Sequence, residues 1–202
     1  TYKLAVTPKN GTTTVITDKS PKLSTIMVPF MKLSNNGIAD TLTKTMGKKV
    51  FNKGTNADGV KAIEQYATAH NISLKNWAYI DGSGLSHQDK VTAEQMTKFL
   101  YHTQKEKYYK SLHTSLPVAG ANERMLGGTL RYRFTTTDMS NRIVAKTGSI
   151  NNVRTLSGYV TQQDGDPLII SVLTGGSSST ALIDSVVTML INDEQNLTAK
   201  KK

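Results

Sequence analysis

Helical and strand-forming patterns occupy separate parts of this sequence, and that separation constrains the fold more than any other feature. Three β-prone stretches, 142–145, 155–161 and 168–174, follow one another in the last third of the chain. They are close enough to form neighbouring antiparallel strands, and the third contains a continuous apolar run, as buried strands do. The most regular helical stripe of the chain comes directly afterwards: Leu182, Ile183, Val186, Val187, Leu190 and Ile191.

The stretch before the sheet, residues 22–135, is predicted to be mostly helical. Apolar residues recur there at helical spacing in four places. The expected helices are 23–31 ending near Ser34, a second that begins there and stops at Gly47, one to about His70 from Val60, and one after the N-cap Thr92. Helices, then a sheet at 142–175, then a covering helix at 179–193 favour an α+β fold over alternating βαβ units.

The N-terminal residues 1–17 have a different pattern. Two short β-prone stretches, Tyr2–Val6 and Thr12–Thr17, flank a turn at Pro8–Gly11. An edge hairpin is the simplest interpretation. A chain of 202 residues with 37% hydrophobic content can bury one sizeable core. We therefore expect residues 1–202 to form one domain or a large piece of one.

The composition excludes several kinds of chemistry. The chain has no cysteine, so it forms no disulfide, thiolate metal site or cysteine nucleophile. Its histidines lack metal-ligand spacing, and no run approaches the roughly 18 apolar residues that cross a bilayer. The net charge of +10 favours contact with polyanions, but the lysines are not interleaved with aromatic residues that would stack on bases. We expect no metal, no cofactor and no nucleic acid.

One tripeptide near the first predicted strand could bind an anion. Lys146, Thr147 and Gly148 are expected at the end of that strand. A lysine beside a hydroxyl can neutralise and hydrogen-bond a carboxylate, and glycine leaves room for a peptide to lie alongside the strand edge. A surface strand that ends in a turn would explain the same three residues.

A second short motif lies where the first predicted helix gives way to the next. The side chains of Ser34, Asn35 and Asn36 could project from this connection into a cleft. Two observations weaken that interpretation. A serine that caps the next helix would explain Ser34 without catalysis, and Ser-x-Asn occurs again at Ser149–Asn151.

Taken together and in this order, the two motifs match the S-x-N and K-T-G motifs of serine β-lactamases and penicillin-binding proteins. Over roughly residues 18–190 the sequence resembles the class C low-molecular-mass penicillin-binding proteins, the D-alanyl-D-alanine carboxypeptidases and endopeptidases of the penicillin-binding protein 4 type. Six further segments carry this resemblance: Ser20–Leu23, Met31–Leu33, Ile38–Asp40, Asp81–Ser86, Leu116–Gly120 and Gly128–Leu130. It implies a β-lactamase/transpeptidase-like fold, a helical cluster on a mainly antiparallel sheet, whose N-terminal part is missing.

The resemblance also implies catalytic roles. Ser34 would relay a proton between the nucleophile and the leaving amine, supported by nearby lysines, and Asn36 would hold the penultimate amide of the substrate. Lys146 would supply positive potential. The backbone N–H of Ser149 would form half of an oxyanion hole.

Other residues would bind substrate. Thr147 would hydrogen-bond the terminal carboxylate of D-alanine or of a β-lactam, and Gly148 would let the backbone approach closely. His87 stands where many relatives carry an arginine that contacts a carboxylate of the stem peptide, so this contact is expected to be weaker or pH-dependent. Asn151, from the second Ser-x-Asn, completes the candidate substrate-binding residues.

The nucleophile motif of the family, Ser-x-x-Lys, does not occur in the sequence. Thr41–Lys44 comes closest, but it lies inside a predicted helix, and we interpret Thr41 as helical surface. An acyl-enzyme requires an activated hydroxyl, so we expect the nucleophile in an N-terminal segment before Thr1. The chain alone is expected to be inactive, with an unpaired sheet edge and an apolar patch where the missing helix would dock.

Two functions remain open from the sequence. The first is a serine-type D-Ala-D-Ala carboxypeptidase, or endopeptidase, that acts outside the cytoplasm on peptidoglycan stem peptides and is acylated by β-lactams. The second is a non-catalytic wall-binding pseudoenzyme, which the missing nucleophile and the +10 charge would explain. Either would be compatible with peripheral contact with an anionic wall polymer or a membrane.

Overall fold

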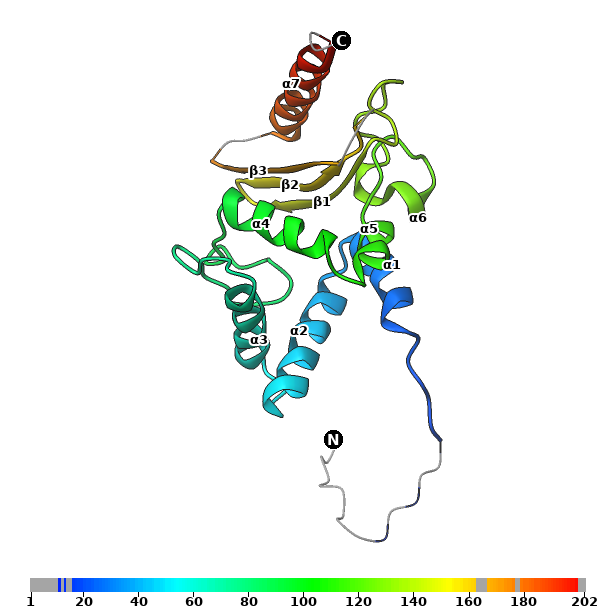
Figure 1. Ribbon diagram of the computed structural model, residues 1–202. Coiled ribbons are helices and arrows are strands. Elements are labelled where there is room, and N and C mark those ends of the chain that lie inside the picture. The colour runs from blue at the N-terminus through cyan, green and yellow to red at the C-terminus, as the bar shows by residue number, and fades with distance from the viewer. Residues whose placement is uncertain (1–10, 12, 14–15, 163–166, 177–178, 200–202) are drawn as a thin grey trace.

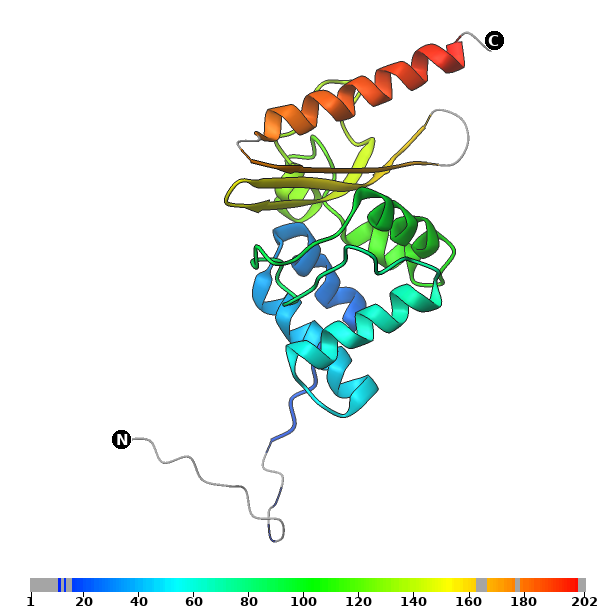
Figure 2. The ribbon, with the colours of Figure 1, turned by 90° about the vertical axis from the view of Figure 1, so that its left-hand side faces the viewer.

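The computed structural model describes residues 11, 13, 16–162, 167–176 and 179–199, with side chains up to Asp193. Figures 1 and 2 show a three-stranded sheet with one helix, α7 (Thr180–Ala199), on one face and the helices α1 to α5 on the other. The helix α4 (Ala93–Gln104) contacts the sheet directly from that second side. The α+β architecture expected from the sequence is confirmed.

The sheet is antiparallel and follows chain order. Its strands are β1 (Ile143–Ile150), β2 (Val153–Val160) and β3 (Leu168–Gly175). The other elements are α1 (Leu23–Leu33), α2 (Asn36–Phe51), α3 (Asn56–Ala69), α5 (Tyr109–Ser115), α6 (Arg124–Gly127) and the 3₁₀ helix η1 (Gly128–Leu130).

Side-chain alternation divides the sheet between two apolar clusters. On one face, buried residues of the strands pack against the stripe on α7 formed by Ile183, Val187 and Ile191. On the other face, Val144 and Tyr159 pack with Leu100 of α4 and with Leu116. Since Lys146 lies two residues after Val144, its side chain leaves β1 on the side of the helical cluster. The hydrophobic pattern of the strand thus decides which way the lysine points.

The helix α2 corrects one prediction, because it does not stop at Gly47. It continues to Phe51 and ends at Asn52, whose φ of 59° is left-handed. Gly47 serves packing instead: a Cβ there would lie 2.6 Å from the backbone nitrogen of Gly59 in α3. The two glycines let α2 and α3 approach closely, which helical periodicity alone does not reveal.

The strand β1 corrects a second prediction. It does not end near Lys146 but runs on to Ile150, because its pairing with β2 continues to Ile150↔Val153. Lys146 and Thr147 therefore lie inside a hydrogen-bonded strand. At the N-terminus, the predicted strand Tyr2–Val6 lies outside the described residues. In the second predicted strand, the described residues Thr13, Ile16 and Thr17 are not in a strand.

Replacing Gly59 with alanine is expected to destabilise the fold by about 2–3 kcal/mol. An added Cβ would lie 2.1 Å from the carbonyl oxygen of Thr43 on α2, a backbone atom that cannot rotate away. Urea denaturation followed by circular dichroism measures this change. The matched control is Gly37→Ala in the exposed first turn of α2, which should stabilise by about 0.5–1 kcal/mol through helix propensity. Equal effects at both glycines would contradict the close-packing argument.

Candidate active site

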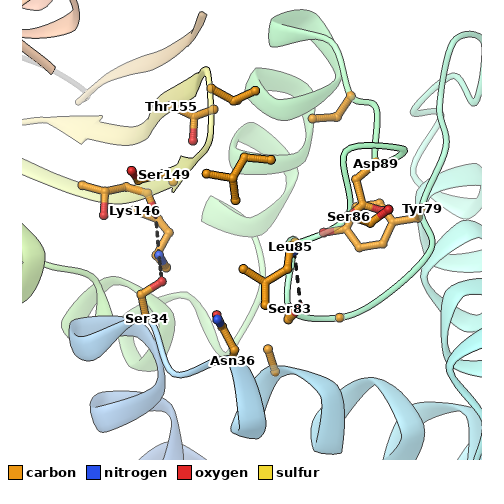
Figure 3. Close-up of a pocket in the computed structure, with 18 of the residues that line it drawn as sticks. Ser34, Asn36, Tyr79, Ser83, Leu85, Ser86, Asp89, Lys146, Ser149 and Thr155 are labelled. Carbon is orange, nitrogen blue, oxygen red and sulfur yellow. Dashed lines mark hydrogen bonds between the residues drawn. The ribbon is translucent and has the colours of Figure 1, made fainter. Parts of the chain in front are cut away.

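A pocket of about 730 Å³ opens between the helical cluster and the sheet. The connection between α1 and α2, the loop 79–91, Thr129 of η1 and the second half of β1 line it. Figure 3 shows Ser34 and Lys146 on one side of this pocket and Tyr79, Ser86 and Asp89 on the other. Segments more than a hundred residues apart in the chain therefore meet in one cavity.

Ser34 is the C-cap of α1, directly after Leu33. Its φ of 52° and ψ of 52° are left-handed, a conformation in which a side chain with a Cβ is disfavoured. The helix end holds this conformation, because the amides of Ser34 and Asn35 both donate to the carbonyl of Phe30. Strained backbone conformations cluster at active sites, so the conformation of Ser34 motivates a functional hypothesis.

The helix cap of α2 is Asn35, not Ser34. The side-chain oxygen of Asn35 accepts a hydrogen bond from the amide of Ile38 at 2.9 Å. The alternative explanation of Ser34 as a capping serine is therefore wrong. Its hydroxyl is free of helix capping and points into the pocket, where it meets Lys146 (Figure 3).

Lys146 joins the two motifs directly. Its Nζ donates to Ser34 Oγ at 2.7 Å and also to the carbonyl oxygen of Thr147. Burial lowers the pKa of Lys146 to about 8, because desolvation disfavours its charged form. An amine that titrates near neutral pH and contacts a serine hydroxyl can take up and return a proton. The pair has the geometry of a proton relay.

The remaining residues of the two motifs lie around this pair. Asn36 begins α2 and is exposed to the pocket. Thr147 Oγ1 donates to Thr129 Oγ1 at 2.7 Å. At Gly148 a Cβ would lie 2.3 Å from Thr155 Oγ1, so glycine keeps this part of the strand open. Ser149 is exposed on the pocket wall.

The loop 81–86 forms the wall opposite β1. Its turn is closed by the carboxylate of Asp81, which accepts from Ser83 Oγ and from the amide of Gly84. Asp40 on α2 accepts from the amide of Gly82, where an added Cβ would lie 2.2 Å from Thr43 Oγ1. The loop is thus anchored on the helix that begins with Asn36.

Not every candidate residue reaches the pocket. His87 lines it and is exposed, but Asn151 lies in the exposed turn between β1 and β2 and is not among the lining residues. Sequence reasoning also missed the contribution of Thr129, Tyr79 and Asp89 to the lining. Gly128–Leu130 was recognisable as a motif, but nothing in the sequence indicated that the hydroxyl of Thr129 meets Thr147.

The described part of the chain offers no alternative metal centre. No group of three or more histidine, cysteine, aspartate or glutamate side chains there could hold a metal ion. Within the same residues, no helix is long and apolar enough to cross a membrane.

Comparison with known proteins decides the family. Residues 3–191 match the model of the D-Ala-D-Ala carboxypeptidase 3 (S13) family. The chain belongs to the S13 peptidases. The resemblance that the motifs carried is therefore confirmed over almost the whole sequence.

Two curated relatives are much longer than this chain. A D-alanyl-D-alanine carboxypeptidase of Actinomadura sp. (strain R39) is 36% identical over 162 residues, which is 80% of this chain but 30% of the relative. The D-alanyl-D-alanine carboxypeptidase DacB of Haemophilus influenzae is 26% identical over 180 residues, 88% of this chain and 37% of the relative. The chain spans about a third of the length of these relatives.

Solved structures agree with the S13 assignment. Penicillin binding protein 4 (dacB) from H. influenzae superposes with a TM-score of 0.72 at 24% identity, over 83% of this chain and 39% of that one. The same protein, complexed with a β-lactam, superposes with a TM-score of 0.69 at 26% identity, over 77% and 35% of the two chains. The transpeptidase-like fold predicted from the resemblance is confirmed.

Proposed function

We propose that this chain is the substrate-holding part of a serine-type D-Ala-D-Ala carboxypeptidase, with endopeptidase activity on the same kind of bond. The hydrogen bond between Lys146 Nζ and Ser34 Oγ is the observation that carries the proposal. It brings the S-x-N and K-T-G motifs of an S13 peptidase together at a pocket of about 730 Å³. This volume suits a short peptide or a β-lactam.

Ser34 would relay the proton in this reaction, and the ammonium of Lys146, which donates to Ser34 Oγ, would supply positive potential. A serine hydroxyl of the complete protein attacks the carbonyl carbon of the D-Ala-D-Ala amide, and its proton passes through Ser34 to the nitrogen of the leaving D-alanine. The C–N bond breaks and an ester to the enzyme remains. Water then hydrolyses this ester and regenerates the serine. The backbone N–H of Ser149 would stabilise the oxyanion together with the N–H of the nucleophile.

The terminal carboxylate of the substrate would lie against Lys146 and Thr147. A lysine ammonium and a hydroxyl side by side supply charge and a directed donor. Asn36 would bind the preceding amide, and Gly148 would admit the peptide along the edge of β1. His87, at the exposed rim of the pocket, would contact the stem-peptide side chain.

An N-terminal segment with Ser-x-x-Lys would complete the site, since no serine of this sequence has a lysine three residues later. Two surfaces support such a partner. In the described residues, β3 pairs on one side only, with β2, and α7 exposes Leu182, Met189 and Leu190 outside its buried stripe. An edge strand and exposed apolar side chains are both surfaces that another segment of the protein can cover. We propose that the complete protein acts outside the cytoplasm, where its peptidoglycan substrate lies.

Labelling with a fluorescent penicillin tests this function. The complete protein should form one covalent adduct on a serine before Thr1, and the 202-residue chain should form none. Mass spectrometry of the labelled peptide locates the adduct. A complete protein without any adduct would refute the enzymatic proposal.

The missing Ser-x-x-Lys also supports a second candidate, a wall-binding pseudoenzyme. Sedimentation with purified peptidoglycan separates the two functions when it is done beside the labelling. Binding without acylation by the complete protein would favour the pseudoenzyme, and acylation would exclude it.

A further inference from the structure

Thr129 is placed at the pocket by two buried neighbours. Gly128 has a φ of +53°, and a Cβ there would lie 2.4 Å from the carbonyl oxygen of Lys32 near the end of α1. Leu130, on the other side, is fully buried in the cluster beneath α7. Thr129 itself is exposed and lines the pocket. The turn therefore holds one hydroxyl between the end of α1 and the strand β1.

The hydroxyl of Thr129 is the acceptor of the hydrogen bond from Thr147. The two oxygens lie 2.7 Å apart, a normal distance between hydroxyl groups. Each hydroxyl has a single proton. While Thr147 donates to Thr129, it cannot donate that proton to a carboxylate. Thr147 must therefore rotate its hydroxyl before it can take the role proposed above.

We propose that Thr129 is a positioning residue of the carboxylate site, and this inference rests on the proposed function. When a carboxylate enters, the proton of Thr147 turns toward it, and Thr129 reverses from acceptor to donor toward Thr147 Oγ1. Each proton stays covalently bound to its own hydroxyl oxygen, and no covalent bond forms or breaks. The resulting chain, from Thr129 through Thr147 to the carboxylate, polarises both hydroxyls in the same direction and strengthens the terminal hydrogen bond.

A carboxylate-specific effect distinguishes this role from a structural one. If Thr129 only supported the strand, loss of its side chain would weaken the binding of all ligands of the pocket alike. If it orients the hydroxyl of Thr147, its loss affects ligands with a free carboxylate more than the corresponding esters or amides. Hydrogen bonds to charged groups are stronger than neutral ones, so the difference should be measurable.

The test compares Thr129→Val and Thr129→Ser in the complete protein. The first measurement is the rate of acylation of each variant by a penicillin and by the methyl ester of that penicillin. We expect Thr129→Val to lower the second-order rate constant about 10-fold for the free acid and less than about 2-fold for the ester. Thr129→Ser, which keeps the hydroxyl, should restore the wild-type ratio. Thr45→Val, at an exposed position of α2, is the matched control and should change neither constant.

Equilibrium binding of N-acetyl-D-Ala-D-Ala and its C-terminal carboxamide gives a second measurement that needs no nucleophile. Thr129→Val should reduce the preference for the carboxylate by a similar factor. If Thr129→Val leaves the ratio of the affinities for carboxylate and carboxamide unchanged, the inference about Thr129 is overturned. The proposed function then still stands, provided that the wild type is acylated. A wild type that is not acylated refutes the proposed function, and the binding ratio then decides on Thr129. A wild type that is not acylated and binds neither peptide would overturn both.

Discussion

Replacing Lys146 with methionine in the complete protein is expected to lower the rate constant for acylation by a β-lactam by about 10³-fold. The substitution keeps the length of the side chain but removes the group that donates to Ser34 Oγ. It also removes the positive charge from a site that is mostly desolvated. Stopped-flow measurement with a chromogenic cephalosporin gives the rate constant. The control is Lys75→Met, at an exposed lysine outside the pocket lining.

The same lysine predicts the pH profile. Burial lowers the pKa of Lys146 to about 8, so the ammonium form is present below pH 8 and is lost as the pH rises above it. Attraction for the substrate carboxylate should fall over that range, and the second-order rate constant should show an alkaline limb with an apparent pKa near 8. Lys146→Arg stays charged and should lack this limb. A limb near pH 10, typical of an exposed lysine, would contradict the assignment.

Ser34→Gly should make the protein more stable and much less active. A glycine at position 34 can adopt the left-handed backbone without the steric penalty of a Cβ. The free energy of unfolding should therefore rise by about 0.5–1 kcal/mol, even though glycine is more flexible in the unfolded chain. The relay hydroxyl is lost, so acylation should slow by about 10²–10³-fold. Urea denaturation and cephalosporin kinetics on the same preparation measure both effects.

Two comparisons isolate the backbone contribution at Ser34. Ser34→Ala removes the hydroxyl but keeps a Cβ in the left-handed conformation, so activity should fall without a gain in stability. Asn52→Gly, at the left-handed end of α2, changes the backbone far from the pocket lining and should leave acylation unchanged. A less stable Ser34→Gly variant would show that the conformation of Ser34 is not strained.

Local patterns predicted the helices and strands well wherever apolar side chains recur along one face of the element. The stripe at Ile183, Val187 and Ile191 is fully buried against the sheet. Thr92 caps α4 by accepting from the amide of Gln95, and the amide of Thr92 donates in return to Gln95 Oε1. The predictions were wrong where a distant contact decides a local feature. Gly47 is a close contact between helices rather than a helix stop, and β1 continues past Lys146 because β2 pairs with it.

Motif order predicted which residues belong to the site, but not all of their neighbours. The pocket contains Ser34, Asn36 and Lys146 as expected, and it leaves out Asn151. The side chain of Asn35 had no expected function, yet it caps α2 and leaves the hydroxyl of Ser34 free. Thr129 gained its importance from a single interatomic distance. Such contacts depend on how segments pack, which spacing along the chain does not encode.

The sequence by itself determined the α+β class, the order of the motifs and the membership in a peptidase family, because periodicity and motif order are properties of the linear chain. Only the tertiary structure placed Lys146 Nζ 2.7 Å from Ser34 Oγ and Thr147 Oγ1 2.7 Å from Thr129 Oγ1. The physical reason is that these pairs are 112 and 18 residues apart. The left-handed end of α1, the glycine contact at Lys32 and the register of β1 bring them together.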